Sequence, residues 1–154
     1  MPNTRRLQMG SSGVDTLDPA PFGDRGLFFG GYSTNIIDYV TIATSPPHDC
    51  LDFGDLSTTA TTYNAACSNG ERIVDHFGTN DEMEYVTVST TGNAQDFGDL
   101  SMADGNGGAT VCASDGVLGR GVWGYRDVLE YVTIKTQGNG VDFGDWLTNR
   151  TQGA

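Results

Sequence analysis

The segment Asp38-Tyr39-Val40-Thr41-Ile42, followed by Leu51-Asp52-Phe53-Gly54-Asp55-Leu56, decides the fold because close copies of it occur twice more, in residues 84–100 and 130–146. The tyrosines of the three copies lie 46 residues apart at each step: Tyr39, Tyr85 and Tyr131. A fixed period between 20 and 50 residues is typical of proteins built from repeated supersecondary units. The sequence therefore predicts a domain of three repeats, at 25–71, 72–119 and 120–154, preceded by residues 1–24.

Each repeat has the pattern of short strands joined by turns. In the Tyr-Val-Thr segment every second residue is apolar, which places Val40 and Ile42, and their counterparts, on one buried face. An apolar run precedes this segment, and an Asp-Phe-Gly-Asp segment follows it, whose phenylalanine we expect to turn inward. A final short strand, such as Ala65-Ala66-Cys67, completes the unit. The prediction is an all-β chain made of four-stranded antiparallel units.

The turn between the second and third strands differs among the repeats. Gly92-Asn93 and Gly138-Asn139-Gly140 tolerate the positive φ that tight hairpins need. The first repeat has the longer and stiffer segment Ser45-Pro46-Pro47-His48-Asp49 instead. Residues 1–24 are expected to form either the first strand of repeat one with a proline-containing linker, or an arm that becomes ordered on a partner.

The charge and the cysteines limit the classes of partner. A formal net charge of −12 repels the phosphates of nucleic acid, so no nucleic-acid partner is expected. Because no segment is apolar enough for a signal peptide or a membrane span, we expect a soluble protein with no membrane insertion. The three cysteines lack metal-ligand spacing and are expected to be buried, reduced thiols: Cys50, Cys67 and Cys112. No cofactor is expected.

Paired aspartates are the only candidates for a metal site. They recur as Asp52 and Asp55, Asp96 and Asp99, and Asp142 and Asp145. Ca²⁺ binds several carboxylate or carbonyl oxygens at one point, but these pairs lack the dense ligand alternation of a calcium loop, so a role in turns is favoured. A glycosidase needs two unlike carboxyl environments, whereas a threefold repeat makes the environments alike. No catalytic residue is predicted, and His48 and His76 are interpreted as exposed or packed imidazoles.

A few aromatic residues are candidates for stacking on sugar rings, because aromatic faces are common at recognition surfaces. The candidates are Tyr32, Trp123 and Tyr125. Packing inside the repeats is the favoured interpretation for each of them.

Two resemblances follow from these motifs. Leu27-Phe28-Phe29-Gly30-Gly31, then Asp38-Tyr39, then Phe53, resembles the Kelch motif, although the other repeats keep single glycines at Gly78 and Gly124. More specifically, the series Tyr-Val-Thr-Ile, Thr-Gly-Asn, Asp-Phe-Gly-Asp-Leu and Ala-Ala-Cys-Ser-Asn-Gly is similar to tandem repeats in virion structural proteins of bacteriophages, notably marine and cyanobacterial phages. This resemblance covers residues 25–146.

The resemblance implies Kelch-like, β-propeller-like blades and a non-enzymatic structural protein of the virion. Three blades are fewer than the usual four to eight. Two chains could therefore combine into one ring, or the repeats could close as a β-trefoil-like pseudo-threefold barrel; a homo-oligomer is expected. The expected location is the external tail or a tail appendage, assembled in the host cytoplasm with other virion proteins as partners. The alternatives are a capsid decoration protein and a carbohydrate-binding module that recognises a host-surface glycan; a depolymerase is the weakest hypothesis.

Overall fold

The computed structural model describes residues 24–31, 33–42, 49–60, 64–77, 80–101, 111–114 and 120–150. These residues form three antiparallel sheets and no helix, which confirms the all-β prediction. The first sheet contains β1 (Arg25–Gly31), β2 (Thr34–Thr41) and β3 (Leu51–Ala60). The second contains β4 (Asn64–Ser68), β5 (Arg72–Phe77), β6 (Glu82–Thr87) and β7 (Gln95–Asp99). The third contains β8 (Val111–Ser114), β9 (Arg120–Thr133) and β10 (Val141–Arg150).

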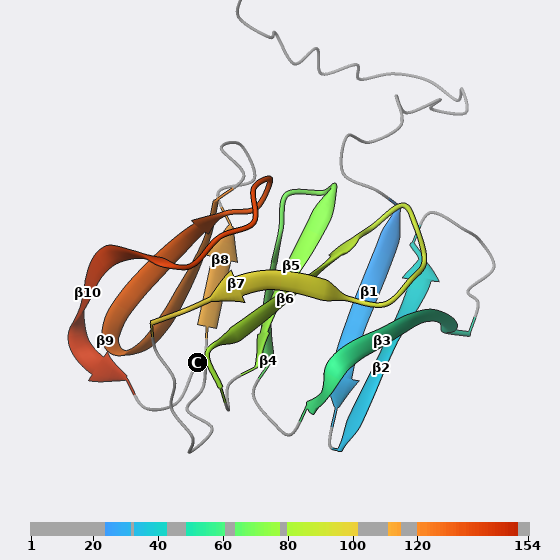
Figure 1. Ribbon diagram of the computed structural model, residues 1–154, viewed down its shortest axis with the longest axis horizontal. Coiled ribbons are helices and arrows are strands. Elements are labelled where there is room, and N and C mark those ends of the chain that lie inside the picture. Colours follow the sequence, from blue (N-terminus) through green and yellow to red (C-terminus); the bar gives the residue numbers. More distant parts are fainter. Residues whose placement is uncertain are drawn as a thin grey trace, which may run out of the picture.

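The three sheets lie side by side in chain order (Figure 1). The described strands thus form three separate sheets, and neither a closed barrel nor a closed propeller ring is seen among them. Strand β9 is long because it folds back on itself. The guanidinium carbon of Arg120 lies 5.0 Å from the ring centre of Tyr131, whereas eleven extended residues would span about 36 Å. The two arms of β9 therefore correspond to β5 and β6 of the middle sheet.

The second and third sheets begin one strand earlier than the predicted repeats. The segment Ala65-Ala66-Cys67, assigned from the sequence to the end of repeat one, belongs to β4, which pairs with β5 and not with β3. The reason is a tight turn, in which the side-chain oxygen of Asn69 accepts hydrogen bonds from the backbone N–H groups of Glu71 and Arg72. In the same way, β8 pairs with the first arm of β9.

A β-bulge occurs at the same place in all three sheets. In the middle sheet Glu84 pairs with Asp96 and Met83 pairs with Gly98, so that Phe97 is the extra residue. Phe53 and Phe143 are the extra residues of the other two sheets. The glycine after each phenylalanine has a positive φ: +150° at Gly54, +134° at Gly98 and +133° at Gly144. A bulge of this kind re-aims a side chain, and its backbone conformation favours glycine.

The three repeated tyrosines have equivalent surroundings. Each makes an edge-on contact with the bulged phenylalanine of its own sheet, with ring centres 5.9 Å apart. Each also carries a guanidinium over its ring, at 4.7 Å in the first two repeats and 5.0 Å in the third. The Arg–Tyr–Phe stacks are Arg25–Tyr39–Phe53, Arg72–Tyr85–Phe97 and Arg120–Tyr131–Phe143. The repeats in the sequence are therefore also repeats in structure.

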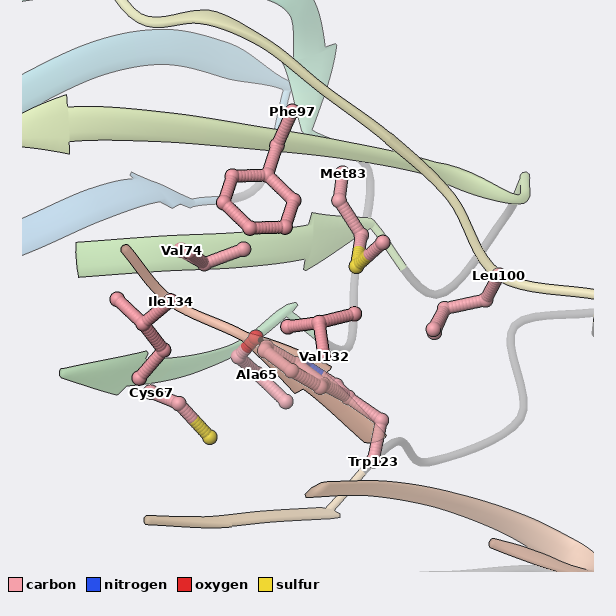
Figure 2. Packing of buried hydrophobic residues seen from close by; sticks show 9 residues of the cluster. All are labelled: Ala65, Cys67, Val74, Met83, Phe97, Leu100, Trp123, Val132 and Ile134. Carbon is pink, nitrogen blue, oxygen red and sulfur yellow. Dashed lines mark hydrogen bonds between the residues drawn. The ribbon is translucent and has the colours of Figure 1, made fainter. Parts of the chain in front are cut away.

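The hydrophobic core lies between neighbouring sheets. The cluster between the first two sheets contains Ile37, Phe53 and Leu56 on one side and Val86 on the other. Figure 2 shows the cluster between the second and third sheets, where Phe97, Met83 and Leu100 face Ile134, Val132 and Trp123. Each internal sheet boundary is thus closed by side chains of two consecutive repeats.

Two expectations about buried residues are wrong at the two ends of this row. Ile42 is 71% exposed, whereas its counterparts Val88 and Ile134 are 5% and 0% exposed. Phe143 is 55% exposed, whereas Phe53 and Phe97 are each 2% exposed. The alternation in the sequence is the same in each repeat, but burial requires a neighbouring sheet, and the described part of the chain supplies none beyond the first or the third sheet.

Gly98→Ala and Gly144→Ala form a matched pair that measures the packing between repeats. Both glycines have nearly the same φ, so both variants carry a similar backbone strain of about 1 to 3 kcal/mol. An added Cβ at Gly98 would lie 2.7 Å from the carbonyl group of Gly138, whereas at Gly144 it would meet nothing within 4 Å. We expect Gly98→Ala to lose about 1 to 3 kcal/mol more unfolding free energy, measured by urea denaturation. Equal losses would contradict the packing described above.

Candidate functional site

The joint between consecutive repeats is the most regular feature of the molecule. We call the strand with the bulged phenylalanine the receiving strand, and the segment from Glu84 or Glu130 through the following Gly-Asn turn the docking hairpin. At the first joint, the backbone N–H groups of Gly92 and Ala94 donate to the carbonyl oxygens of Phe53 and Asp55, at 2.8 and 2.9 Å. The second joint repeats these bonds from Gly138 to Phe97 and from Gly140 to Asp99, at 2.8 and 2.7 Å.

Polar side chains of the docking hairpin add a second set of bonds. The side-chain oxygens of Asn93 and Asn139 accept from the backbone N–H groups of Asp55 and Asp99, at 3.1 and 3.2 Å. The buried carboxylate of Glu84 accepts from the backbone N–H of Ser57, and that of Glu130 accepts from the N–H of Ser101. Hydrogen bonds to a charged acceptor are stronger than neutral ones. The glutamate and the asparagine of each docking hairpin therefore both contribute hydrogen bonds to the joint.

Arginine reaches across the joint in the opposite direction. Arg25 lies over Tyr39 of its own repeat, and its guanidinium donates to the carbonyl oxygen of Val88 in the next repeat at 3.1 Å. Arg72 donates in the same way to the carbonyl oxygen of Lys135 at 2.9 Å. The Arg–Tyr–Phe stack thus links the interior of one repeat to the strand end of the next.

The receiving strand of the third repeat, β10, holds no docking hairpin in the described part of the chain. We call its residues Phe143, Gly144, Asp145 and Leu147 the terminal face. Phe143 is half exposed, Leu147 is fully exposed, and a Cβ added at Gly144 would meet no atom within 4 Å. The exposed large apolar residues of the described chain lie in the first and third sheets and none lies in the second. An apolar surface is therefore open at each end of the row.

The first repeat does not carry a docking hairpin of the internal type. Asp38 stands where the other repeats have glutamate, and the proline-containing segment stands where they have the Gly-Asn turn. Residues 43–48 of that segment lie outside the described residues. Phe28 and Ile42 are exposed at this end. The two ends of the row are thus chemically different.

The paired aspartates have structural roles at the joints. Side-chain oxygens of Asp96 and Asp142 accept from the backbone N–H groups of Gly98 and Gly144, at 3.1 and 3.0 Å, and so support the bulge. Asp55 and Asp99 present their backbone N–H groups to the asparagine of the next repeat. Within the described ranges, no three His, Cys, Asp or Glu side chains come together as a metal site. The geometry agrees with the turn interpretation.

Of the three aromatic candidates for sugar stacking, the structure describes the side chain of Trp123. Trp123 is fully buried, and its indole N–H donates to the carbonyl oxygen of Ala65 at 3.1 Å. Its ring faces are therefore covered by protein. Tyr32 and the side chain of Tyr125 lie outside the described residues.

Strand β5 contains a buried polar pair: His76, which was interpreted from the sequence as exposed or packed, is buried, and Asp75 beside it was not expected to be. Asp75 and His76 are almost completely buried, at positions where the first repeat has apolar residues. The His76 Nε2–H donates to the carbonyl oxygen of Asn80 at 2.9 Å, while His76 Nδ1 and Asp75 Oδ1 have no hydrogen-bond partner in the described structure. Burial lowers the pKa of His76 to about 4 and raises the pKa of Asp75 well above its usual range. The break in the apolar run was the signal that could have identified this pair.

The cysteines take three different environments. Cys67 is buried, Cys112 is half buried, and Cys50 is exposed, so the expectation of a buried thiol is wrong for Cys50. The Cys67 thiol donates to the carbonyl oxygen of Ala113, and the Cys112 thiol donates to that of Ala66. These bonds join β4 to β8 across the second joint. The contact with Cys112 and burial both raise the pKa of the Cys67 thiol, which keeps it protonated.

No family model, characterised protein or solved structure matches the chain. Within the described ranges, no helix is long and apolar enough to cross a membrane.

Phe97→Ala and Phe143→Ala test the difference between an occupied and an open receiving strand. Phe97 is buried in the second joint, so its loss should reduce the unfolding free energy by about 3 to 5 kcal/mol. Phe143 keeps mainly its edge-on contact with Tyr131, so its loss should cost about 1 kcal/mol. Thermal and urea denaturation of both variants measure this difference. A loss at Phe143 as large as that at Phe97 would show that the terminal face is covered.

Asp75→Asn tests the buried polar pair through pH dependence. A carboxyl with a raised native pKa binds more protons when folded, so the wild-type unfolding free energy falls as pH rises above about 4. Asparagine does not ionise, so the unfolding free energy of the variant does not fall in this way as pH rises. The variant should therefore be more stable than the wild type at pH 7, and the difference should disappear near pH 4. His76 acts oppositely, because its native pKa of about 4 makes stability fall as pH drops below about 6.5.

The measurement is the unfolding free energy of both proteins between pH 4 and pH 7. In the variant, His76 is the titrating residue of this pair that remains, and its contribution to the pH dependence has a maximum slope of about 1.4 kcal/mol per pH unit. Its stability should therefore fall more steeply on acidification than that of the wild type. Parallel curves would contradict a neutral, buried Asp75.

Proposed function

We propose that the protein is a non-enzymatic structural component of a bacteriophage particle, in which the β repeats act as an assembly module. The single observation that carries this proposal is the identity of the two joints, each built from the same backbone, asparagine and glutamate bonds, next to a third receiving strand that is open. A protein built in this way can bind a further β repeat through the same contact that joins its own repeats. The similarity of its motifs to repeats of phage virion proteins supports the assignment to a virion.

We place the protein in the external tail or one of its appendages, where repeat modules join other virion proteins. The arrangement of three sheets in a row supports propeller-like blades, since each sheet packs its face against the next. Capsid decoration is the alternative location, because the same open face would serve there. A carbohydrate-binding role has less support, since Trp123 is buried.

The test is the protein content of purified particles of a phage that carries the gene. We expect the protein at a fixed copy number, with immunogold labelling on the tail. Phe143→Ser should lower the copy number, because it removes the ring from the terminal face. Leu51→Ser is the matched control: Leu51 and Phe143 are both 55% exposed, but Leu51 makes none of the hydrogen bonds or core contacts of the joints described above. Absence of the protein from purified particles would overturn the proposal.

A further inference from the structure

We propose that the terminal face receives the docking hairpin of a β repeat on a different polypeptide chain. That hairpin carries a glutamate before its Tyr-Val-Thr strand and a Gly-Asn turn after it. The inference rests on the proposed role in assembly and names the partner of the open surface.

The two internal joints supply the template for this contact. In both, the turn glycine donates to the carbonyl oxygen of the bulged phenylalanine, and the turn asparagine accepts from the N–H of the second aspartate. In both, the glutamate carboxylate accepts from the N–H two residues after that aspartate. A surface with the same backbone geometry presents the same groups to a third hairpin.

The terminal face retains that geometry, and no hairpin of the described residues occupies it. The bulge has the same register, and Gly144 has nearly the same φ as Gly98. The side chain of Asp142 supports the N–H of Gly144 at 3.0 Å, as Asp96 supports that of Gly98 at 3.1 Å. The rings of Tyr131 and Phe143 are also 5.9 Å apart, as in the occupied repeats. Because the strand is already formed, binding requires little rearrangement of the receiving side.

The terminal face is also more apolar than the internal receiving strands. Leu147 stands where the occupied repeats have Ser57 and Ser101, and its side chain is fully exposed. A hairpin from another chain has no covalent link to hold it in place, so it needs additional apolar burial to offset the entropy lost on association. Ser57 and Ser101 remain exposed in the occupied joints, so the burial comes from Phe143, whose counterparts Phe53 and Phe97 are each 2% exposed there.

A second copy of this chain does not supply the hairpin. Its second and third repeats have their Gly-Asn turns seated on their own neighbours. Its first repeat has Asp38 in place of the glutamate and the proline-containing segment in place of the turn. An aspartate is one methylene shorter, and proline lacks the backbone N–H that the turn must donate. The chemistry therefore selects a partner chain with an internal-type hairpin.

The probe is a cyclic peptide with the sequence of residues 130–141, closed through a D-Pro–L-Pro unit that enforces the hairpin and labelled with a fluorophore. This segment contains the main groups by which the third repeat contacts the second, including Glu130, Asn139 and Gln137, whose amide donates to the carbonyl oxygen of Asp96. Because isolated hairpins are only marginally stable, cyclisation is needed. Binding to the full chain is measured by fluorescence anisotropy.

We expect saturable binding that Phe143→Ser weakens at least about tenfold, since a central aromatic residue dominates small interfaces. A peptide with Asn139→Ala and Glu130→Ala should bind at least about tenfold more weakly, while Leu51→Ser in the protein should leave binding unchanged. Lack of saturable binding, or binding that Phe143→Ser does not change, would overturn the inference. Sedimentation at rising protein concentration is the second measurement. Self-association that Phe143→Ser abolishes would identify a second copy as the occupant and also overturn it.

The outcome is independent of the particle experiment. A protein that is present in particles but does not bind the peptide retains the proposed function and loses this inference. A protein that binds the peptide but is absent from particles retains the inference and loses the phage assignment.

Discussion

The bulge in each Asp-Phe-Gly-Asp segment is the constraint on which the rest of the structure depends. One extra residue in the strand turns the phenylalanine toward the next sheet, where Phe97 fills the core of the second joint. The same bulge leaves the phenylalanine carbonyl available to the turn glycine of the next repeat. The following glycine has no side chain, which lets that turn approach: a Cβ at Gly54 would lie 2.4 Å from the carbonyl oxygen of Gly92.

Placing the core between the sheets makes the stability of each repeat depend on its neighbours. In such a linear array the total stability is approximately a sum of repeat and nearest-neighbour contributions. The middle sheet has a neighbour on both sides and shows no large exposed apolar residue among those described, whereas the outer sheets expose Ile42 and Phe143. It is also the sheet that accommodates Asp75 and His76, a buried polar pair that costs free energy. Two joints on the same sheet offset that cost.

Much of the fold could be predicted from the sequence, because period and alternation are local signals. The 46-residue period identified equivalent tyrosines, and alternation identified Val86 and Val132 as buried. The pairing of β4 with β5 was missed, since the repeat period does not show where a sheet begins. The exposure of Phe143 was missed because it depends on a neighbouring sheet, which the described residues do not supply, and not on its own repeat. For the site, the sequence showed that Asp38, Glu84 and Glu130 occupy equivalent positions. The greater length of glutamate became meaningful only when the structure showed that Glu84 and Glu130 accept hydrogen bonds from the backbone N–H groups of Ser57 and Ser101.

The difference between the two ends of the row has a physical consequence for association. A receiving strand and a docking hairpin are different surfaces, so a contact between them is heterologous, and repeated heterologous contacts grow into rings or open filaments. A first repeat with a glutamate and a Gly-Asn turn would fit the terminal face of another copy, and exposed apolar ends would then promote uncontrolled growth. Asp38 and the proline-containing segment remove both groups from the first repeat. These substitutions leave the terminal face open while working against head-to-tail polymerisation through the internal contact.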